Sequence, residues 1–295
     1  MSRVANWSKW MPLNGAGRNQ EIPVNIGLYR IRVKGTEKVI YIGETGEKKR
    51  GLRGRVGSLA SGTYRLAEMP YRDPHTAAPA LWALRDRDGV EFEVSVSVFE
   101  GPKVERKMLE AIELACHRSM FGSSPAFNFG RMPHGYKMSS GNNSGLIERG
   151  LRFRGGPTEQ NQTNWLPSCP PVGQLDDDVT STNWCGHTWS DWRRIEQVIS
   201  SEGDQLGFYR IRSAGASKLI YLGQGQIFSR LRAHLSKVGT ITEQGEILSS
   251  ASPLEASFAR SSSSLPSHQM EELETDLIGT YGLKTGSIPE AQFIG

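Results

Sequence analysis

The sequence has few cysteines and no long apolar run, and both absences narrow what the protein can be. Three of its 295 residues are cysteine, an odd number and too few for a disulfide framework in so long a chain. No stretch approaches the roughly eighteen apolar residues of a membrane span, and the first residues lack a signal-peptide core. We therefore expect a cytoplasmic protein with no membrane partner and no obligate protein partner.

A zinc site is the one alternative use of the thiols. Cys185-Gly186-His187 resembles part of such a site, with Cys169 nearby in the sequence. No Cys-x-x-Cys or second histidine completes the set of ligands. We expect ordinary thiols in a loop.

Acidic residues are scarce in the first half of the chain. Residues 1–154 contain 25 Lys and Arg against 15 Asp and Glu, a net charge of +10. Residues 155–295 contain 10 against 16, a net charge of −6. Concentrated positive charge attracts a polyanion and speeds its capture. We therefore predict that nucleic acid contacts two basic clusters, which are Lys48, Lys49, Arg50 and Arg53, and then Arg149, Arg152 and Arg154.

The most informative feature present is an internal duplication. Residues 27–46 and 207–226 are identical at ten of twenty positions, at an offset of 180. Both segments contain Gly-x-Tyr followed by Tyr-x-Gly. Trp7-Ser8-Lys9-Trp10 also has a counterpart in Trp189-Ser190-Asp191-Trp192. A chain of 295 residues accommodates two such copies as two domains.

The hydrophobic pattern predicts the same order of elements in both copies. In the first copy, Ile, Val and Tyr dominate two short runs around Gly35, which indicates an antiparallel hairpin. We expect strands at 26–33, 38–43 and 91–99, with helices at 52–60, 80–86 and 104–120. In the second copy we expect strands at 207–213, 218–223 and 254–260, with helices at 228–237 and 267–281.

These observations predict an organisation in three parts. The first copy spans residues 1–130 and is basic, and the second spans 188–295, is acidic and has diverged in part. Residues 131–187 between them are rich in Gly, Ser, Asn and Pro, a composition typical of a linker. Its basic residues make it a candidate for contact with nucleic acid.

The paired tyrosine motifs, followed by a helical Arg, a later Glu and a Pro-x-x-Asn, resemble the GIY-YIG endonuclease superfamily. The resemblance covers residues 27–128 and, less fully, 207–292. It implies an α/β (α+β) fold of two tandem small domains, each a three-stranded antiparallel sheet flanked by helices and joined by a long irregular linker. It also implies hydrolysis of phosphodiester bonds with one divalent metal ion, Mg²⁺ or Mn²⁺.

The resemblance assigns candidate catalytic residues in both copies. Glu110 is preferred over Glu113 because it stands fifteen residues before a proline, as Glu274 does. The first copy supplies Tyr29, Tyr41, Arg55, Glu110 and Asn128. The second supplies Tyr209, Tyr221, Arg230, His234 and Glu274. Glu110 and Glu274 are the candidate metal ligands.

The residue types suit the chemistry. A fixed guanidinium stabilises the negative charge that grows on the phosphoryl oxygens, so it suits Arg55. Mg²⁺ keeps several waters and needs few protein ligands, so one carboxylate suffices. Tyrosine has an ordinary pKa of about 10, so Tyr29 acts as a base only if a cation favours its phenolate. Tyr41 is expected to orient the water or the phosphate.

Each copy departs from the family pattern, which leaves alternatives open. The first has Leu59 where the second has His234, and the second has Gln292 where Asn is expected. Because the second copy is acidic, we expect the first to be the principal cutter of DNA, double-stranded more than single-stranded. An internal pseudo-dimer that cuts both strands, as in restriction or defence, is one hypothesis. A structure-specific repair nuclease with one working site and a degenerate protein that only binds nucleic acid are the others.

Overall fold

A computed structural model describes residues 4–67, 77–137, 156–157, 165–175, 178–200, 203–261 and 265–294. The chain divides into two compact units. The N-terminal unit contains residues 5–101 and 124–168, and the C-terminal unit contains residues 1–4, 102–123 and 169–295. These units divide the chain differently from the two sequence copies, because the first copy's last helix lies in the C-terminal unit. The copy boundaries at 130 and 188 stay a prediction about the duplication.

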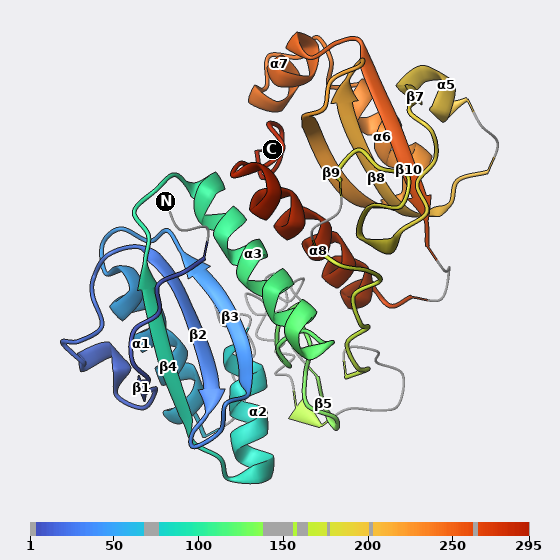
Figure 1. The fold of residues 1–295 in the computed structure, drawn as a ribbon. Coiled ribbons are helices and arrows are strands. Elements are labelled where there is room, and N and C mark those ends of the chain that lie inside the picture. Colours follow the sequence, from blue (N-terminus) through green and yellow to red (C-terminus); the bar gives the residue numbers. More distant parts are fainter. Residues whose placement is uncertain are drawn as a thin grey trace, which may run out of the picture. The chain divides into compact units, whose positions relative to one another are not determined.

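The N-terminal unit is built on an antiparallel sheet with strand order β1-β4-β2-β3 (Figure 1). The predicted hairpin and third strand are confirmed as β2 (Gly27–Val33), β3 (Val39–Thr45) and β4 (Phe92–Val98). The expected three strands gain a fourth, since the two-residue β1 (Met11–Pro12) pairs with β4. The unit also contains η1 (Ala16–Arg18), α1 (Gly51–Tyr64), α2 (Ala78–Asp88), β5 (Tyr136–Lys137) and β6 (Gly156–Pro157).

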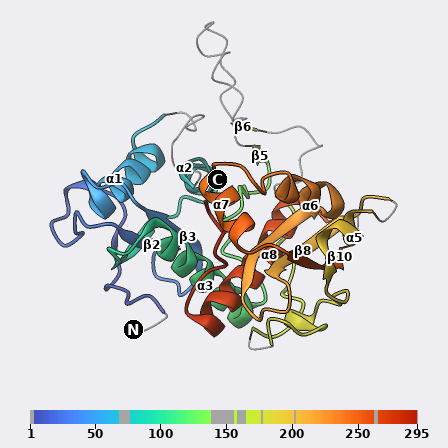
Figure 2. The ribbon, with the colours of Figure 1, turned by 90° about the horizontal axis from the view of Figure 1, so that it is seen from above.

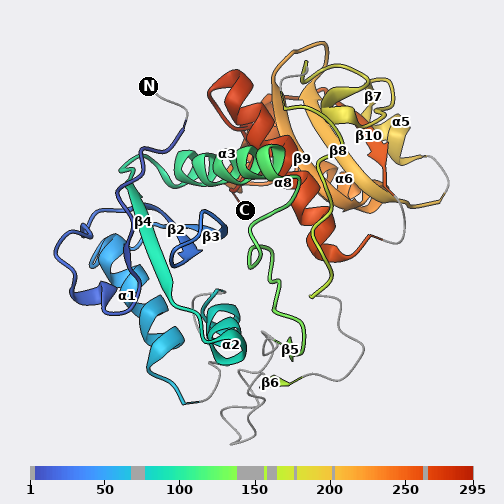
Figure 3. The same cartoon turned by 60° about the horizontal axis from the view of Figure 1, so that its bottom comes forward.

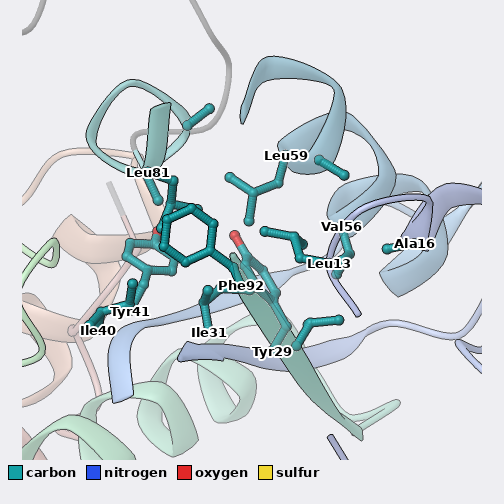
Figure 4. Close-up of a cluster of buried hydrophobic side chains, with 14 of the residues drawn as sticks. Leu13, Ala16, Tyr29, Ile31, Ile40, Tyr41, Val56, Leu59, Leu81 and Phe92 are labelled. Atoms are coloured by element: carbon teal, nitrogen blue, oxygen red, sulfur yellow. The ribbon is translucent and has the colours of Figure 1, made fainter. Parts of the chain in front are cut away.

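One face of this sheet carries the core of the unit. Alternation along the strands directs Tyr29 and Ile31 of β2 to the same side. They pack there with Tyr41 against buried residues of α1 and α2, which lie on the same side of the sheet (Figure 2). Tyr29 and Tyr41 are therefore part of a packed cluster that also contains Leu81 and Phe92 (Figure 4).

The C-terminal unit contains a second antiparallel sheet, with strand order β7-β10-β8-β9. Its strands are β7 (Arg193–Arg194), β8 (Leu206–Ser213), β9 (Leu219–Gln226) and β10 (Leu254–Arg260). The predicted helices are present as α6 (Ile227–Leu235) and α8 (Ser267–Thr285). The unit also contains α3 (Lys103–Phe121), η3 (Trp184–Gly186), α5 (Ile195–Ile199) and α7 (Glu243–Ser250).

Both faces of the second sheet are covered. Tyr209 and Ile211 of β8 pack toward Phe228 of α6 and Leu248 of α7. Their neighbour Phe208 points to the opposite face and packs with the apolar residues of α8. Side chains that alternate along β8 thus belong to two different clusters, as expected for a strand buried on both sides.

The duplication extends to individual hydrogen bonds. The Ser8 hydroxyl accepts from the Val96 amide at 3.0 Å, and the Ser190 hydroxyl accepts from the Phe258 amide at 3.1 Å. Both hairpins have a register shift at the same place, after Ile31 in one and after Ile211 in the other. The serine of each Trp-Ser-x-Trp motif therefore joins the chain to the third strand of its own sheet.

The tryptophans of these motifs stack on the repeated arginines of the hairpin. The guanidinium of Arg30 lies 4.5 Å from the Trp7 ring centroid and 4.8 Å from that of Trp10. Arg210 lies 4.4 Å from Trp189 and 4.7 Å from Trp192. Arg210 is completely buried and donates to the carbonyls of Val179 and Ser181 at 2.7 and 2.9 Å. Such stacking stabilises the buried guanidinium of Arg210, because these two hydrogen bonds go to carbonyl oxygens and not to a carboxylate.

Helices α3 and α8 are counterparts in the two copies and pack against one another (Figure 3). Each has 19 residues, follows a proline and ends at a glycine in the left-handed conformation. The equivalent positions Ala115 and Gly279 meet: a Cβ added to Gly279 would lie 2.6 Å from that of Ala115. Contact between equivalent positions is the property of a two-fold helix pair.

A buried ionic group holds one end of this pair. Arg118 of α3 donates to both carboxylate oxygens of Asp276 of α8, at 2.7 and 2.9 Å. Its guanidinium also lies 3.2 Å from the Glu272 carboxylate and donates to the Cys169 carbonyl at 3.0 Å. Because removing one partner of a buried pair leaves an uncompensated charge, this group fixes the alignment of the two helices.

Candidate active site

The second copy brings all of its predicted catalytic residues to one pocket. The pocket has a volume of about 590 Å³ and lies in the C-terminal unit. Four elements supply its functional side chains, which are Tyr209 from β8, Tyr221 from β9, Arg230 and His234 from α6, and Glu274 from α8. Residues that are up to 65 positions apart in the sequence therefore share one cavity.

The glycine of each Tyr-x-Gly lies directly beside the two phenol rings. A Cβ on Gly223 would lie 2.5 Å from the Tyr209 hydroxyl and 2.8 Å from the Tyr221 ring. In the first copy, a Cβ on Gly43 would lie 2.9 Å from the Tyr29 hydroxyl. All three distances are shorter than ordinary contacts, so any side chain at this position would displace a tyrosine. The motif needs glycine because the phenol rings occupy that space.

Tyr209, Tyr221 and His234 form a compact aromatic group in the pocket. The Tyr209 hydroxyl and His234 Nε2 are 3.0 Å apart, within hydrogen-bond distance. The His234 and Tyr221 ring centroids are 4.2 Å apart. Burial, with smaller contributions from Lys237 and Arg230, lowers the pKa of His234 to about 4. The imidazole is therefore neutral near pH 7 and shares a hydrogen bond with the Tyr209 hydroxyl.

The pKa values of the two phenols are raised. Burial is the main cause for Tyr209, and the charges of Tyr221 and Glu274 act in the same direction. For Tyr221 the causes are burial and then Glu274, while Arg230 lowers the pKa of both phenols. Both phenols are thus neutral at pH 7, and an added positive charge beside Glu274 would favour their ionisation.

Glu274 is a buried carboxyl group whose pKa is raised. Burial and then the charge of Glu271 raise its pKa to about 7, although a backbone hydrogen bond from Gln224 and the charge of Arg230 oppose the shift. A cation at this carboxylate would return it to the ionised form. One carboxylate beside two phenol oxygens fits a hard ion such as Mg²⁺, which keeps most of its waters.

Metal ions that need several protein ligands are not favoured by the residues described. Across the described ranges, no three His, Cys, Asp or Glu side chains gather in a group able to hold an ion. Cys169 Sγ lies 3.5 Å from the Glu272 carboxylate. His187 packs on Phe208 with ring centroids 4.9 Å apart, and burial lowers its pKa to about 4.

Three lysines of the pocket lining were not predicted. Lys103 and Lys107 come from α3, and Lys237 follows α6. Together with Arg230 they give the lining four cationic side chains and one carboxylate, that of Glu274. The negative net charge of residues 155–295 therefore does not describe the charge of this pocket, because Lys103 and Lys107 belong to the first half of the sequence. Only the folded chain places α3 beside the second copy's site.

Gln292 takes over the role of asparagine in the second copy. Asn128 is buried, accepts from the Ile42 amide at 3.0 Å and donates to the Ile42 carbonyl at 2.7 Å. Gln292 accepts from the amide of Leu222, the residue equivalent to Ile42, at 3.1 Å. Both side chains fix the middle residue of a Tyr-x-Gly motif. The substitution therefore preserves the contact with the strand.

No protein-family model, curated protein or solved structure matches the chain. The superfamily resemblance rests on the residues alone. Within the described residues, no helix is long and apolar enough to cross a membrane.

The first copy brings part of its predicted set together in the N-terminal unit. Arg55 Nε donates to the Tyr29 hydroxyl at 3.3 Å, and the Tyr29 and Tyr41 rings are 5.9 Å apart. Glu110 lies on α3, in the other unit, at the position equivalent to Glu274 of α8. Its assignment as a metal ligand stays a prediction from the spacing.

The predicted nucleic-acid contacts have different surroundings. Lys48, Lys49 and Arg50 are exposed before α1. Arg53 donates to the carbonyls of Ile22 and Gln20, at 2.7 and 3.2 Å, so its guanidinium helps to hold the chain before β2. These bonds use two of the five N–H donors of the guanidinium. Arg149, Arg152 and Arg154 lie outside the described residues.

Proposed function

We propose that the protein is a divalent-metal-dependent endonuclease that hydrolyses phosphodiester bonds in DNA. The observation that carries this proposal is the convergence of Tyr209, Tyr221, Arg230, His234 and Glu274 in one pocket. The set matches the tyrosines, arginine and glutamate that the GIY-YIG resemblance implies, in the same order along the chain. Four cationic side chains around the pocket suit a polyanionic substrate.

In this proposal, Arg230 and the lysines bind the substrate. The Arg230 guanidinium approaches the scissile phosphate and stabilises the charge that develops on its non-bridging oxygens. Lys103, Lys107 and Lys237 are placed to bind neighbouring phosphates. Glu274 would hold the Mg²⁺ or Mn²⁺, which supplies a Lewis acid for a phosphoryl oxygen and lowers the pKa of bound water.

Tyr209 and His234 provide a route for the proton of the attacking water. The water oxygen forms a bond to phosphorus while one water proton passes to the Tyr209 oxygen. The phenol proton passes at the same time to His234 Nε2, 3.0 Å away. The bond from phosphorus to the leaving oxygen breaks, this oxygen takes a proton from solvent, and His234 returns its proton to solvent. Tyr221 positions the water or the phosphate.

The paired helices support a version with two sites. Glu110 and Glu274 occupy equivalent positions of α3 and α8, and these helices meet through the equivalent positions Ala115 and Gly279. A protein with internal two-fold pairing matches the symmetry of duplex DNA, whose two strands are related in the same way. We propose that each copy cuts one strand.

The direct test is cleavage of supercoiled plasmid with Mg²⁺. Wild type should give linear product, and Glu110→Gln and Glu274→Gln should each give nicked circles, because one site of two is lost. Glu246→Gln provides the control, since Glu246 is an exposed glutamate of α7 outside the pocket. It should cut as wild type does.

Two other outcomes of this experiment would favour the alternative hypotheses, a nuclease with one working site or a protein that only binds nucleic acid. If Glu110→Gln abolishes all cutting and Glu274→Gln changes nothing, only the first copy is a nuclease. Binding of plasmid with no cutting by wild type, and with no loss of binding in either variant, would identify a degenerate protein that only binds nucleic acid.

A further inference from the structure

A second pocket, separate from the catalytic residues, lies along α1 in the N-terminal unit. Its volume is about 660 Å³, and it is lined by the η1 turn and by one side of α1. Tyr29, Tyr41 and Arg55 are not among its lining residues. The side chain of Arg55 points instead to the Tyr29 hydroxyl. This pocket therefore uses a different side of α1 from the catalytic arginine.

Glycines shape the pocket by bringing backbone segments together. A Cβ on Gly57 of α1 would lie 2.7 Å from the Cα of Gly17 in η1, so the turn rests directly on the helix. A Cβ on Gly54 would overlap the side chain of Arg50. Because Gly54 and Gly57 have no side chains, the surface of α1 leaves room for the Arg50 side chain to pack against its first turn.

The pocket is strongly cationic. Its lining contains three exposed arginines, Arg18, Arg50 and Arg65, and no Asp or Glu. Within the described part of the chain, no carboxylate lies within ion-pair distance of any of the three guanidinium groups. Glu47 is close in sequence, but its carboxylate accepts from the backbone amides of Lys49 and Arg50.

The arrangement suits an extended anion. Arg50 precedes α1 and Arg65 follows it, so their Cα atoms are roughly 20 Å apart at 1.5 Å per helical residue. One DNA strand presents a phosphate about every 3.4 Å of duplex axis, so the distance covers several phosphates. The hydroxyls of Ser58 and Ser61 line the pocket between the arginines and can donate to phosphate oxygens.

We propose that the α1 pocket, with Arg18, Arg50 and Arg65, binds the phosphate backbone of a DNA strand outside the catalytic pocket. The proposal rests on the proposed function in one respect, since it takes DNA as the substrate. The pocket adds affinity and sets the position of the duplex, whereas the chemistry depends on other residues. Guanidinium groups bind phosphates as forks with two parallel hydrogen bonds, which suits this role.

The test measures binding apart from cutting. A fluorescent DNA duplex is titrated with the full-length protein in EDTA, at several salt concentrations between about 50 and 200 mM. One variant carries Arg18→Ala, Arg50→Ala and Arg65→Ala. The control removes the same charge from exposed positions outside the pocket, by Lys34→Ala, Lys38→Ala and Arg87→Ala. A second pocket variant replaces the three arginines by lysine, which keeps the charge.

The pocket variant should bind at least about tenfold more weakly at low salt. Its slope of log affinity against log salt should fall by about 2 to 3, because each lost phosphate contact removes about 0.9. The lysine variant should keep most of this slope, and the control should bind as wild type does. The proposal is overturned if the pocket variant binds as wild type does, or if the control loses as much affinity.

Plasmid cutting distinguishes this proposal from the proposed function. At DNA concentrations below saturation, the pocket variant should cut more slowly than wild type, in proportion to its lost affinity. If wild type never cuts DNA but the pocket variant still loses affinity, the nuclease proposal fails and the binding site stands. If cutting is normal and affinity is unchanged, the nuclease proposal stands and the binding site fails.

Discussion

Tyr29 and Tyr209 occupy equivalent positions in the two copies, yet their hydroxyl groups meet different side chains. Tyr29 accepts from the guanidinium of Arg55 at 3.3 Å. Tyr209 is 3.0 Å from the neutral imidazole of His234, at the position where the first copy has the buried Leu59. A guanidinium can only donate hydrogen bonds, whereas a neutral imidazole can also accept one. The same fold therefore holds its central phenol in two different proton environments.

This difference indicates that the copies share a scaffold more closely than a chemistry. Both keep the glycine beside the phenols, the amide side chain that fixes the Tyr-x-Gly strand, and the Trp-Ser-x-Trp contacts to the third strand. The second copy has His234 within hydrogen-bond distance of the Tyr209 hydroxyl, whereas the first copy has Leu59 at the equivalent position. We therefore expect a proton route that depends on histidine in the second copy and not in the first.

Removal of the arginines should have the largest effect. Arg230→Ala should slow cutting by the second copy by about 10²- to 10³-fold, because a donor to the developing phosphoryl charge is lost. Arg55→Ala should do the same in the first copy. Each rate is measured on plasmid in a background where the other copy carries its Glu→Gln change. Equal and negligible effects in both copies would show that neither guanidinium acts in the reaction.

Exchange of residues 59 and 234 should have a smaller effect and tests the comparison itself. His234→Leu gives the second copy the side chain of the first, and it should slow cutting about 10²-fold by removing a proton acceptor. Leu59→His gives the first copy a histidine and serves as the reciprocal variant. The pH–rate profile is the measurement, since a purely structural histidine would change the rate without changing the profile. An unaltered profile in His234→Leu would remove His234 from the proton route.

Loss of the amide side chains of Asn128 and Gln292 should have the smallest effect of the three changes. The two variants should lose different amounts of stability. Asn128→Ala removes two hydrogen bonds to Ile42, and Gln292→Ala removes the one to Leu222. Each buried backbone group left without a partner costs about 1 to 3 kcal/mol, so Asn128→Ala should destabilise the protein more. Denaturant unfolding of both variants gives the free energies of unfolding. A larger loss in Gln292→Ala would contradict this account of the two strands.

Much of the fold could be predicted from the sequence because the duplication repeats most of the elements. The hairpins, the third strands and the long helices follow from apolar periodicity, and β10 (Leu254–Arg260) matches its prediction at both ends. The edge strands β1 and β7 were missed because two residues carry no periodic signal. The helix α7 was missed because its small and polar residues resemble a loop.

The candidate site was predictable where it follows the family pattern and unpredictable where it depends on packing. The tyrosines, Arg230, His234 and Glu274 could be named from the family resemblance and the match between the two copies. Lys103 and Lys107 could not, because they reach the second copy's pocket only through the position of α3. The equivalence of Gln292 and Asn128 also required the structure, since only their shared bond to the strand reveals it.

The most direct test of the central claim is whether Glu274 binds a divalent cation. With a pKa of about 7, this carboxyl is half protonated at pH 7 in the absence of metal, and binding must displace that proton. Its ionised fraction grows as pH rises, so the cation should bind more tightly as pH increases from about 6 to 8.

Calorimetric titration of Mg²⁺ in buffers of different ionisation enthalpy counts the protons released. Wild type should release about half a proton more than Glu274→Gln at pH 7, and the difference should vanish well above that pH. Equal proton release and equal affinity in wild type and Glu274→Gln would contradict the account.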